Sequence, residues 1–141
     1  MSAGFVVDNS VVMAWCFKDE SDAYADRVLK SLTLSSALAP TIWPLELVNV
    51  LLAAERRKRI CEEDSMQFIA LLNRLPIRVG PQPLADGLMD ELMPLARKYG
   101  LSSYDASYLH LAIRHGIALA TRDEKLRAAA KKAKVPIWAL K

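Results

Sequence analysis

The sequence has few of the residues that build zinc sites, disulfides or membrane anchors. Its 141 residues include only two cysteines and two histidines. The spacing of zinc ligands is found neither between the cysteines, Cys16 and Cys61, nor between the histidines, His110 and His115. The cysteines lie in apolar or helical contexts, which favours reduced thiols in a cytoplasmic protein. The first apolar run is too short to span a bilayer and has no basic segment before it, so we expect neither a signal peptide nor a membrane anchor.

A strong charge of one sign is also absent. The net charge is +3, with 52% hydrophobic and 25% charged residues, which excludes a disordered chain. We found no internal repeat, low-complexity segment or linker, and the length suits one domain over residues 1–141. A slightly basic background would suit a phosphate-containing substrate, but ordinary solubility explains the same charge equally well.

Short apolar segments alternate with helical patterns along the chain. We expect strands at 4–7, 37–40, 77–79, 117–120 and 135–140, and helices at 11–17, 20–34, 43–59, 62–74, 84–99, 105–115 and 124–134. Ser102 with Asp105, and Thr121 with Glu124, have the spacing of capping boxes. Strands alternating with helices predict an α/β fold, a three-layer α/β/α sandwich around a central parallel sheet of about five strands.

Four carboxylates interrupt or end apolar stretches, where an unpaired charge is costly. Asp8 and Asp123 follow the first and fourth expected strands, and the carboxyl ends of parallel strands share one edge of the sheet. Asp105 begins the helix before the fourth strand. Glu46 lies on an otherwise apolar helix and shares a face with Asn49. Together they predict one acidic pocket, whose oxygen ligands suit Mg²⁺ or Mn²⁺ better than zinc.

Each of these residues also has a purely structural interpretation. Asp8, Asp105 and Asp123 could cap helices or favour their N-termini, and Glu46 could pair with an arginine. Ser10 and Thr121 are more typical of caps than of metal ligands.

Basic residues offer two further candidate sites. Arg56, Arg57 and Arg59 form part of a basic helix end that could contact RNA or simply be solvated. The basic segment 122–134, which begins at Arg122, has the same two interpretations.

Four segments, in this order, resemble the motifs of PIN-domain ribonucleases, and most closely the small VapC toxins of bacterial toxin–antitoxin systems. They are Val6-Val7-Asp8-Asn9-Ser10, Pro44-Leu45-Glu46-Leu47-Val48-Asn49-Val50-Leu51, Ser103-Tyr104-Asp105-Ala106-Ser107-Tyr108-Leu109 and Ala120-Thr121-Arg122-Asp123. The resemblance extends over essentially the whole chain.

This resemblance implies a PIN-like fold and a Mg²⁺- or Mn²⁺-dependent endoribonuclease that cleaves structured RNA, such as transfer or ribosomal RNA. Asp8, Glu46, Asp105 and Asp123 match the family's catalytic and metal-binding acidic quartet. Ser10, Asn49 and Thr121 match its supporting polar positions. Family members typically form homodimers and are neutralised by a VapB antitoxin.

Two other functions remain open from the sequence. The chain could be a non-catalytic module that binds RNA or a protein. It could also be a phosphoryl-transfer domain with Asp8 as acceptor, although Ser10 stands where such phosphatases usually have a second aspartate. In addition, the helix at 43–59 has more apolar surface than one core face needs, which predicts burial against a second copy.

Overall fold

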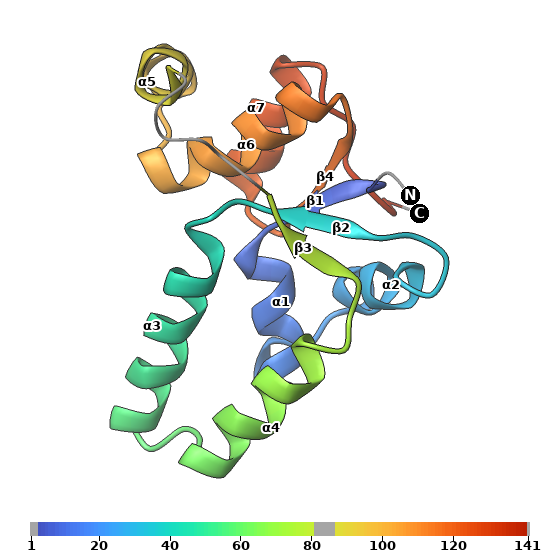
Figure 1. Ribbon diagram of the computed structural model, residues 1–141, viewed down its shortest axis with the longest axis vertical. Coiled ribbons are helices and arrows are strands. Elements are labelled where there is room, and N and C mark those ends of the chain that lie inside the picture. The colour runs from blue at the N-terminus through green and yellow to red at the C-terminus, as the bar shows by residue number, and fades with distance from the viewer. Residues whose placement is uncertain (1–2, 81–86, 141) are drawn as a thin grey trace.

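The central sheet has four short parallel strands. The computed structural model describes residues 3–80 and 87–140. The strands are β1 (Phe5–Val7), β2 (Ala37–Ala39), β3 (Ile77–Val79) and β4 (Ala118–Ala120), in the order β3-β2-β1-β4 (Figure 1). β1 lies between β2 and β4, and its three residues are fully buried. Its apolar sequence is that of a strand covered on both faces.

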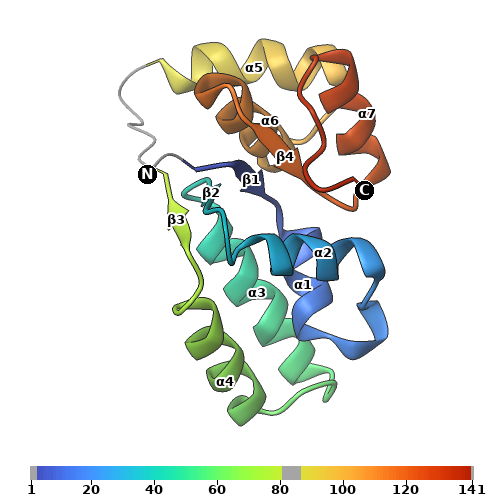
Figure 2. The same cartoon turned by 90° about the vertical axis from the view of Figure 1, so that its right-hand side faces the viewer.

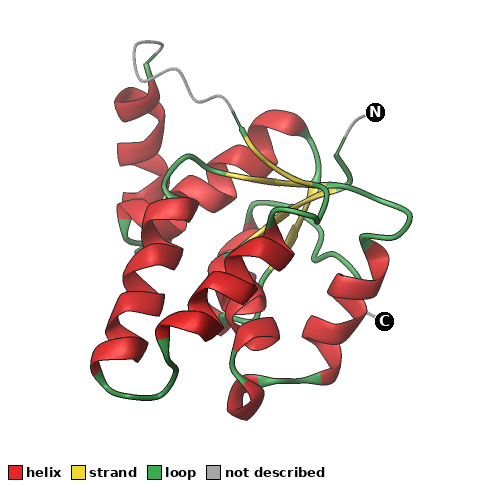
Figure 3. Ribbon diagram, turned by 60° about the horizontal axis from the view of Figure 1, so that its bottom comes forward, coloured by secondary structure: helices red, strands yellow, loops and turns green. Residues whose placement is uncertain are grey.

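Helices cover both faces of the sheet, which confirms the three-layer α/β/α arrangement (Figures 2 and 3). One layer contains α1 (Asn9–Cys16), α2 (Ala23–Ser31), α3 (Trp43–Arg56), α4 (Glu62–Leu72) and a short 3₁₀ helix, η1 (Lys18–Glu20). The other contains α5 (Leu88–Tyr99), α6 (Ser103–His115) and α7 (Glu124–Lys132).

Helix α6 is the central element of its layer. It packs against α5, α7, β1 and β4, and every residue from Ala106 to Ala112 is buried. Ser102 caps the helix by accepting a hydrogen bond from the Asp105 backbone N–H at 3.1 Å. Gly116 ends it with a φ of 63°, a left-handed conformation that glycine adopts without a steric penalty. The site residues on α6 are therefore carried by a rigid, well-packed element.

The predicted fifth strand is wrong. In the segment 135–140 only Ile137 forms a bridge, with Leu119 of β4. Pro136 has no N–H to donate to a ladder, and Ala139 has a φ of 53°, which takes the backbone out of the extended conformation. Trp138 instead anchors the segment, because its ring stacks on Phe5 with centroids 4.6 Å apart.

Some predicted helix ends are also wrong. The helix predicted at 20–34 is shorter in the structure, because α2 begins at Ala23, where the Asp22 side chain caps it by accepting from the Ala25 N–H at 2.6 Å, and Glu20 belongs to η1. Helix α3 ends at Arg56, and Lys58 has a φ of 59°. Residues 84–86 of the predicted helix at 84–99 lie outside the described residues.

Cys16 and Cys61 are both free thiols. Across residues 3–80 and 87–140, no helix combines the length and apolar character needed to cross a bilayer.

Replacing Leu109 with alanine should destabilise the fold strongly. Leu109 is fully buried on α6, and loss of such a side chain typically costs about 2–5 kcal/mol of unfolding free energy. Ile113, one turn later and 44% exposed, provides the control, since its replacement with alanine should cost only about 0.5 kcal/mol. Urea denaturation of both variants tests this, and equal losses would contradict the packing described for α6.

Candidate active site

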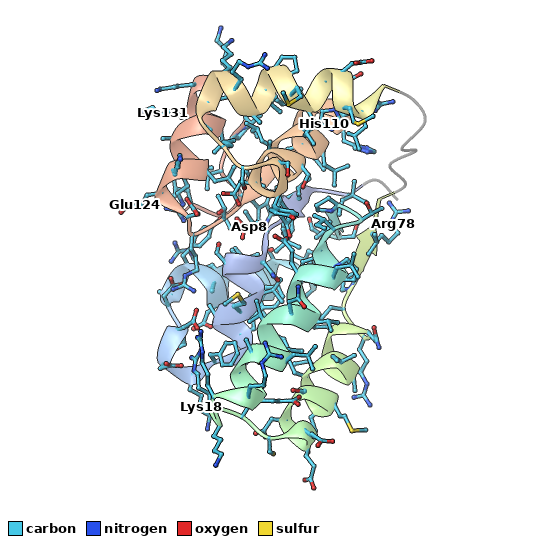
Figure 4. The ribbon with its side chains drawn as sticks, turned by 90° about the vertical axis from the view of Figure 1, so that its left-hand side faces the viewer. Asp8, Lys18, Arg78, His110, Glu124 and Lys131 are labelled. Atoms are coloured by element: carbon cyan, nitrogen blue, oxygen red, sulfur yellow. The ribbon has the colours of Figure 1, made fainter. Side chains whose placement is uncertain are left out.

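The four predicted carboxylates line one cavity at the carboxyl ends of β1 and β4. The cavity has a volume of about 400 Å³, and Figure 4 shows Asp8 between the two layers of helices. We call this the acidic cavity. The residues that line it are Asp8, Asn9, Ser10, Met13, Glu20, Glu46, Asp105, Tyr108, Arg122 and Asp123.

Asp8 is the most buried of the four carboxylates, with 5% of its surface exposed. Its backbone N–H donates to the Ala120 carbonyl at 3.0 Å, which continues the pairing of β1 with β4. One carboxylate oxygen accepts from the Ser10 N–H, so that Asp8 caps α1. The other accepts from the Thr121 hydroxyl at 2.5 Å. Capping and a place in the cavity are therefore compatible roles for Asp8.

Ser10 and Thr121 join the loop after β1 to the loop after β4. The fully buried Thr121 Oγ1, which donates to Asp8, also accepts from the Asp123 N–H at 3.1 Å. Ser10 Oγ accepts from the Arg122 N–H at 2.8 Å and lies 3.4 Å from Thr121 Oγ1. The predicted T-x-x-E capping box is wrong, because Asp123 rather than Thr121 caps α7, accepting from Leu126 N–H at 3.0 Å.

Glu46 and Asp105 enter the cavity from opposite helical layers. Glu46 is on α3 and Asp105 is in the first turn of α6. The Tyr108 hydroxyl donates to Glu46 Oε1 at 2.5 Å. Tyr108 follows Asp105 by three residues on the same helix, a spacing that could have indicated its place in the site.

Two other polar residues of the cavity, Asn9 and Glu20, were not predicted from the sequence. Asn9 is held by the Trp43 indole N–H, which donates to its Oδ1 at 3.1 Å. Glu20 adds a fifth carboxylate to the lining. Asn9 directly follows Asp8 in the first motif, so its place was accessible from the sequence, whereas Glu20 belongs to no motif that we identified.

Burial and like charge raise the pKa values of three carboxyls. Burial raises the pKa of Asp8 to about 6. The hydrogen bonds from Thr121 and Ser10 lower this pKa, and the nearby charge of Asp105 raises it further. Burial and then Asp105 raise the pKa of Glu46, opposed by the Tyr108 hydrogen bond. The pKa of Asp105 is itself raised by burial and by Asp123. Asp105 therefore interacts electrostatically with each of the other three carboxyls of the quartet.

The donor chemistry of the acidic cavity fits a hard divalent cation. Its candidate ligands are oxygen atoms, which Mg²⁺ and Mn²⁺ prefer, and a cation would offset the like charges that raise these pKa values. Within residues 3–80 and 87–140, no group of three or more His, Cys, Asp or Glu side chains is already arranged to hold a metal ion. The fit therefore rests on the kind of donors and their electrostatics.

The predicted RNA-contacting arginines do not lie together. Arg122 lines the cavity, but its guanidinium binds Asp22 at 2.8 Å and the Ser10 carbonyl at 3.0 Å. Arg59 pairs with Asp19 at 3.2 Å, outside the cavity lining. The exposed Arg56 and Arg57 are at the end of α3, and Arg56 follows Glu46 by ten residues, roughly 15 Å along the helix axis.

Asn49 is likewise not one of the cavity-lining residues. It is exposed on α3, although it shares a helix face with Glu46. Among the described residues, no hydrogen bond or ion pair joins Asn49 to the quartet, in contrast to Ser10 and Thr121, which both bond to Asp8.

The raised pKa of Asp8 predicts how stability depends on pH without metal. Burial raises the pKa of Asp8 from 3.8 to about 6 in the folded protein. Ionisation of Asp8 therefore opposes folding, and stability that is present at low pH is lost between about pH 4 and pH 6. In EDTA, the unfolding free energy of Asp8→Asn should rise relative to that of the wild-type protein by up to roughly 3 kcal/mol over this range. Urea denaturation at several pH values measures the difference, and a difference independent of pH would refute the prediction.

Comparison with known proteins places the chain in a family. The family model for the PIN domain matches residues 5–132. A similar solved structure is the crystal structure of PAE2754 from Pyrobaculum aerophilum, at 26% sequence identity and a TM-score of 0.70, covering 92% of this chain and 87% of that one. A search of curated proteins gives no match. The chain belongs to the PIN-domain family.

Proposed function

We propose that this protein is a Mg²⁺- or Mn²⁺-dependent endoribonuclease that hydrolyses phosphodiester bonds in RNA. PIN domains are generally nucleases. The observation that carries the proposal is the acidic cavity, in which all four carboxylates of the quartet meet at the carboxyl edge of the sheet. That edge is where open α/β folds place their functional crevices.

Asp8, Glu46, Asp105 and Asp123 would hold the cation. When bound, it would activate water for in-line attack on phosphorus and stabilise the leaving oxygen. Thr121 and Ser10 fix the orientation of the Asp8 carboxylate through their hydrogen bonds. Preorganised donors of this kind lower the cost of assembling the site during the reaction.

In the cell we propose that the protein is the cytoplasmic toxin of a type II toxin–antitoxin system. It would arrest growth by cleaving structured RNA, a transfer or ribosomal RNA, and a cognate VapB-type antitoxin would neutralise it. The four motifs, which occur along the chain in the order typical of VapC toxins, support this proposal. Its test is growth arrest on expression, relieved by Asp8→Asn and by co-expression of the gene for a small DNA-binding protein encoded next to it.

Asp8→Asn should abolish RNA cleavage. Removal of one carboxylate weakens the proposed cation site, and we expect a loss of at least about 100-fold, in the range of essential electrostatic groups. The measurement is cleavage of transfer and ribosomal RNA with Mg²⁺, with Mn²⁺ and with EDTA. Asp26→Asn, on the exposed face of α2, provides the control and should cleave like wild type.

Two alternative functions give different results in this assay. A binding module would bind RNA without cleaving it, and binding would survive Asp8→Asn. A phosphoryl-acceptor domain would form a stable aspartyl phosphate with a phosphodonor. The sequence gives little support to the second, since Ser10 stands where such phosphatases usually have a second aspartate.

We also propose that the protein forms a homodimer through α3. Its buried face is Trp43, Leu47, Leu51 and Ala54. A second apolar stripe at spacings of three and four residues is exposed, namely Leu45 at 65%, Val48 at 46% and Leu52 at 44%. Val48 also lines an apolar groove of about 270 Å³ between α3, α4 and β3. Such a surface is typical of an interaction site.

Leu45→Glu should convert a wild-type dimer to a monomer, because it places a charge at the most exposed position of the apolar stripe. Sedimentation velocity at micromolar concentration measures the oligomeric state. Leu34→Glu is the matched control, since Leu34 is 90% exposed in the loop after α2, and it should leave the dimer intact. A monomeric wild-type protein would contradict the proposal.

A further inference from the structure

Tyr108 is a buried residue of the cavity, and its hydroxyl donates a hydrogen bond to a carboxylate. Its side chain is on α6, the residue is 2% exposed, and it lines the acidic cavity. The hydroxyl donates to Glu46 Oε1 at 2.5 Å. A hydrogen bond to a charged acceptor is shorter and stronger than one between neutral groups, so this contact is a strong restraint on Glu46.

The contact joins the two helical layers across the cavity. Glu46 is carried by α3 on one side of the sheet, and Tyr108 by α6 on the other (Figure 2). Glu46 is partly exposed, and a glutamate has three side-chain torsions that are costly to order. Without a partner, it would have to be ordered whenever a ligand binds. Among the described residues, Oε2 of Glu46 has no hydrogen-bond partner, in contrast to Oε1.

We propose that Tyr108 is a positioning residue that binds Oε1 of Glu46 and thereby orients Oε2 as a ligand for a divalent cation in the acidic cavity. This inference rests on the cation of the proposed function. Tyr108 would touch neither the cation nor the RNA, and its effect would pass entirely through Glu46. Partners that orient metal ligands in this way typically contribute about 10- to 100-fold to metal affinity.

The test is Mn²⁺ binding to the protein without RNA, followed by the electron paramagnetic resonance signal of free Mn²⁺. Tyr108→Phe keeps the buried ring and removes the hydroxyl, and we expect about 10- to 100-fold weaker binding. Tyr24→Phe is the matched control, because Tyr24 is also buried and its hydroxyl donates to the Trp138 carbonyl at 2.7 Å, outside the cavity lining. This control should bind Mn²⁺ like wild type.

A double-mutant cycle separates positioning from an independent role. If Tyr108 acts through Glu46, adding Tyr108→Phe to Glu46→Gln should have almost no further effect on Mn²⁺ affinity. Additive losses would overturn the inference, as would a Tyr108→Phe variant that binds within about twofold of wild type, a change far below that expected for such a partner.

A spectroscopic measurement covers the case in which Tyr108→Phe does not fold. In wild-type protein labelled with fluorotyrosine, Mg²⁺ should shift the Tyr108 resonance, and Glu46→Gln should abolish the shift. A Tyr108 resonance that does not respond to Mg²⁺ would overturn the inference.

Failure of the proposed function has a different signature. A wild-type protein that binds Mn²⁺ with the expected cycle but cleaves no RNA would refute the nuclease and leave the role of Tyr108 intact. Cleavage and metal binding that are both unaffected by Tyr108→Phe would refute the role of Tyr108 alone. A wild-type protein that binds no Mn²⁺ would overturn both.

Discussion

The site depends on the burial of Asp8 at the end of the central strand. Strand β1 lies between β2 and β4, and its register pairs Val7 with Ala120, so the next residues on each strand, Asp8 and Thr121, come side by side. Their hydrogen bond of 2.5 Å satisfies a carboxylate that is almost excluded from water. Without such partners, a buried carboxylate would cost several kcal/mol. The loops after β1 and β4 are fixed relative to each other by this network.

The other three carboxylates are arranged around Asp8 by elements from both layers. Asp123 caps α7, α6 carries Asp105 in its first turn, and α3 carries Glu46. Asp105 raises the pKa values of both Asp8 and Glu46, and its own pKa is raised by Asp123. The sheet edge therefore concentrates negative charge, and Lys125 opposes the rise in pKa at Asp105. This arrangement favours an exogenous cation over an internal salt bridge.

Local sequence was sufficient where local physics decides the structure. The apolar run before Asp8 and the spacing between Ser102 and Asp105 predicted a strand and a helix cap that the structure contains. The T-x-x-E pattern at Thr121 failed because the Thr121 hydroxyl is used by Asp8, 113 residues away in sequence. The fifth strand failed because Pro136 and the backbone at Ala139 limit pairing to a single bridge.

The sequence by itself determined the alternation of strands and helices, the order of the four acidic motifs and the position of Asp8 and Asp123 after strands. These follow from patterns a few residues long and from the rule that parallel strands share a carboxyl edge. The tertiary structure decided which polar groups meet. It brought Asp105 to the quartet, joined Tyr108 to Glu46, bound Arg122 to Asp22 and left Asn49 outside the cavity lining. The physical reason is that hydrogen bonds between elements depend on strand register and helix packing, which no single segment of sequence contains.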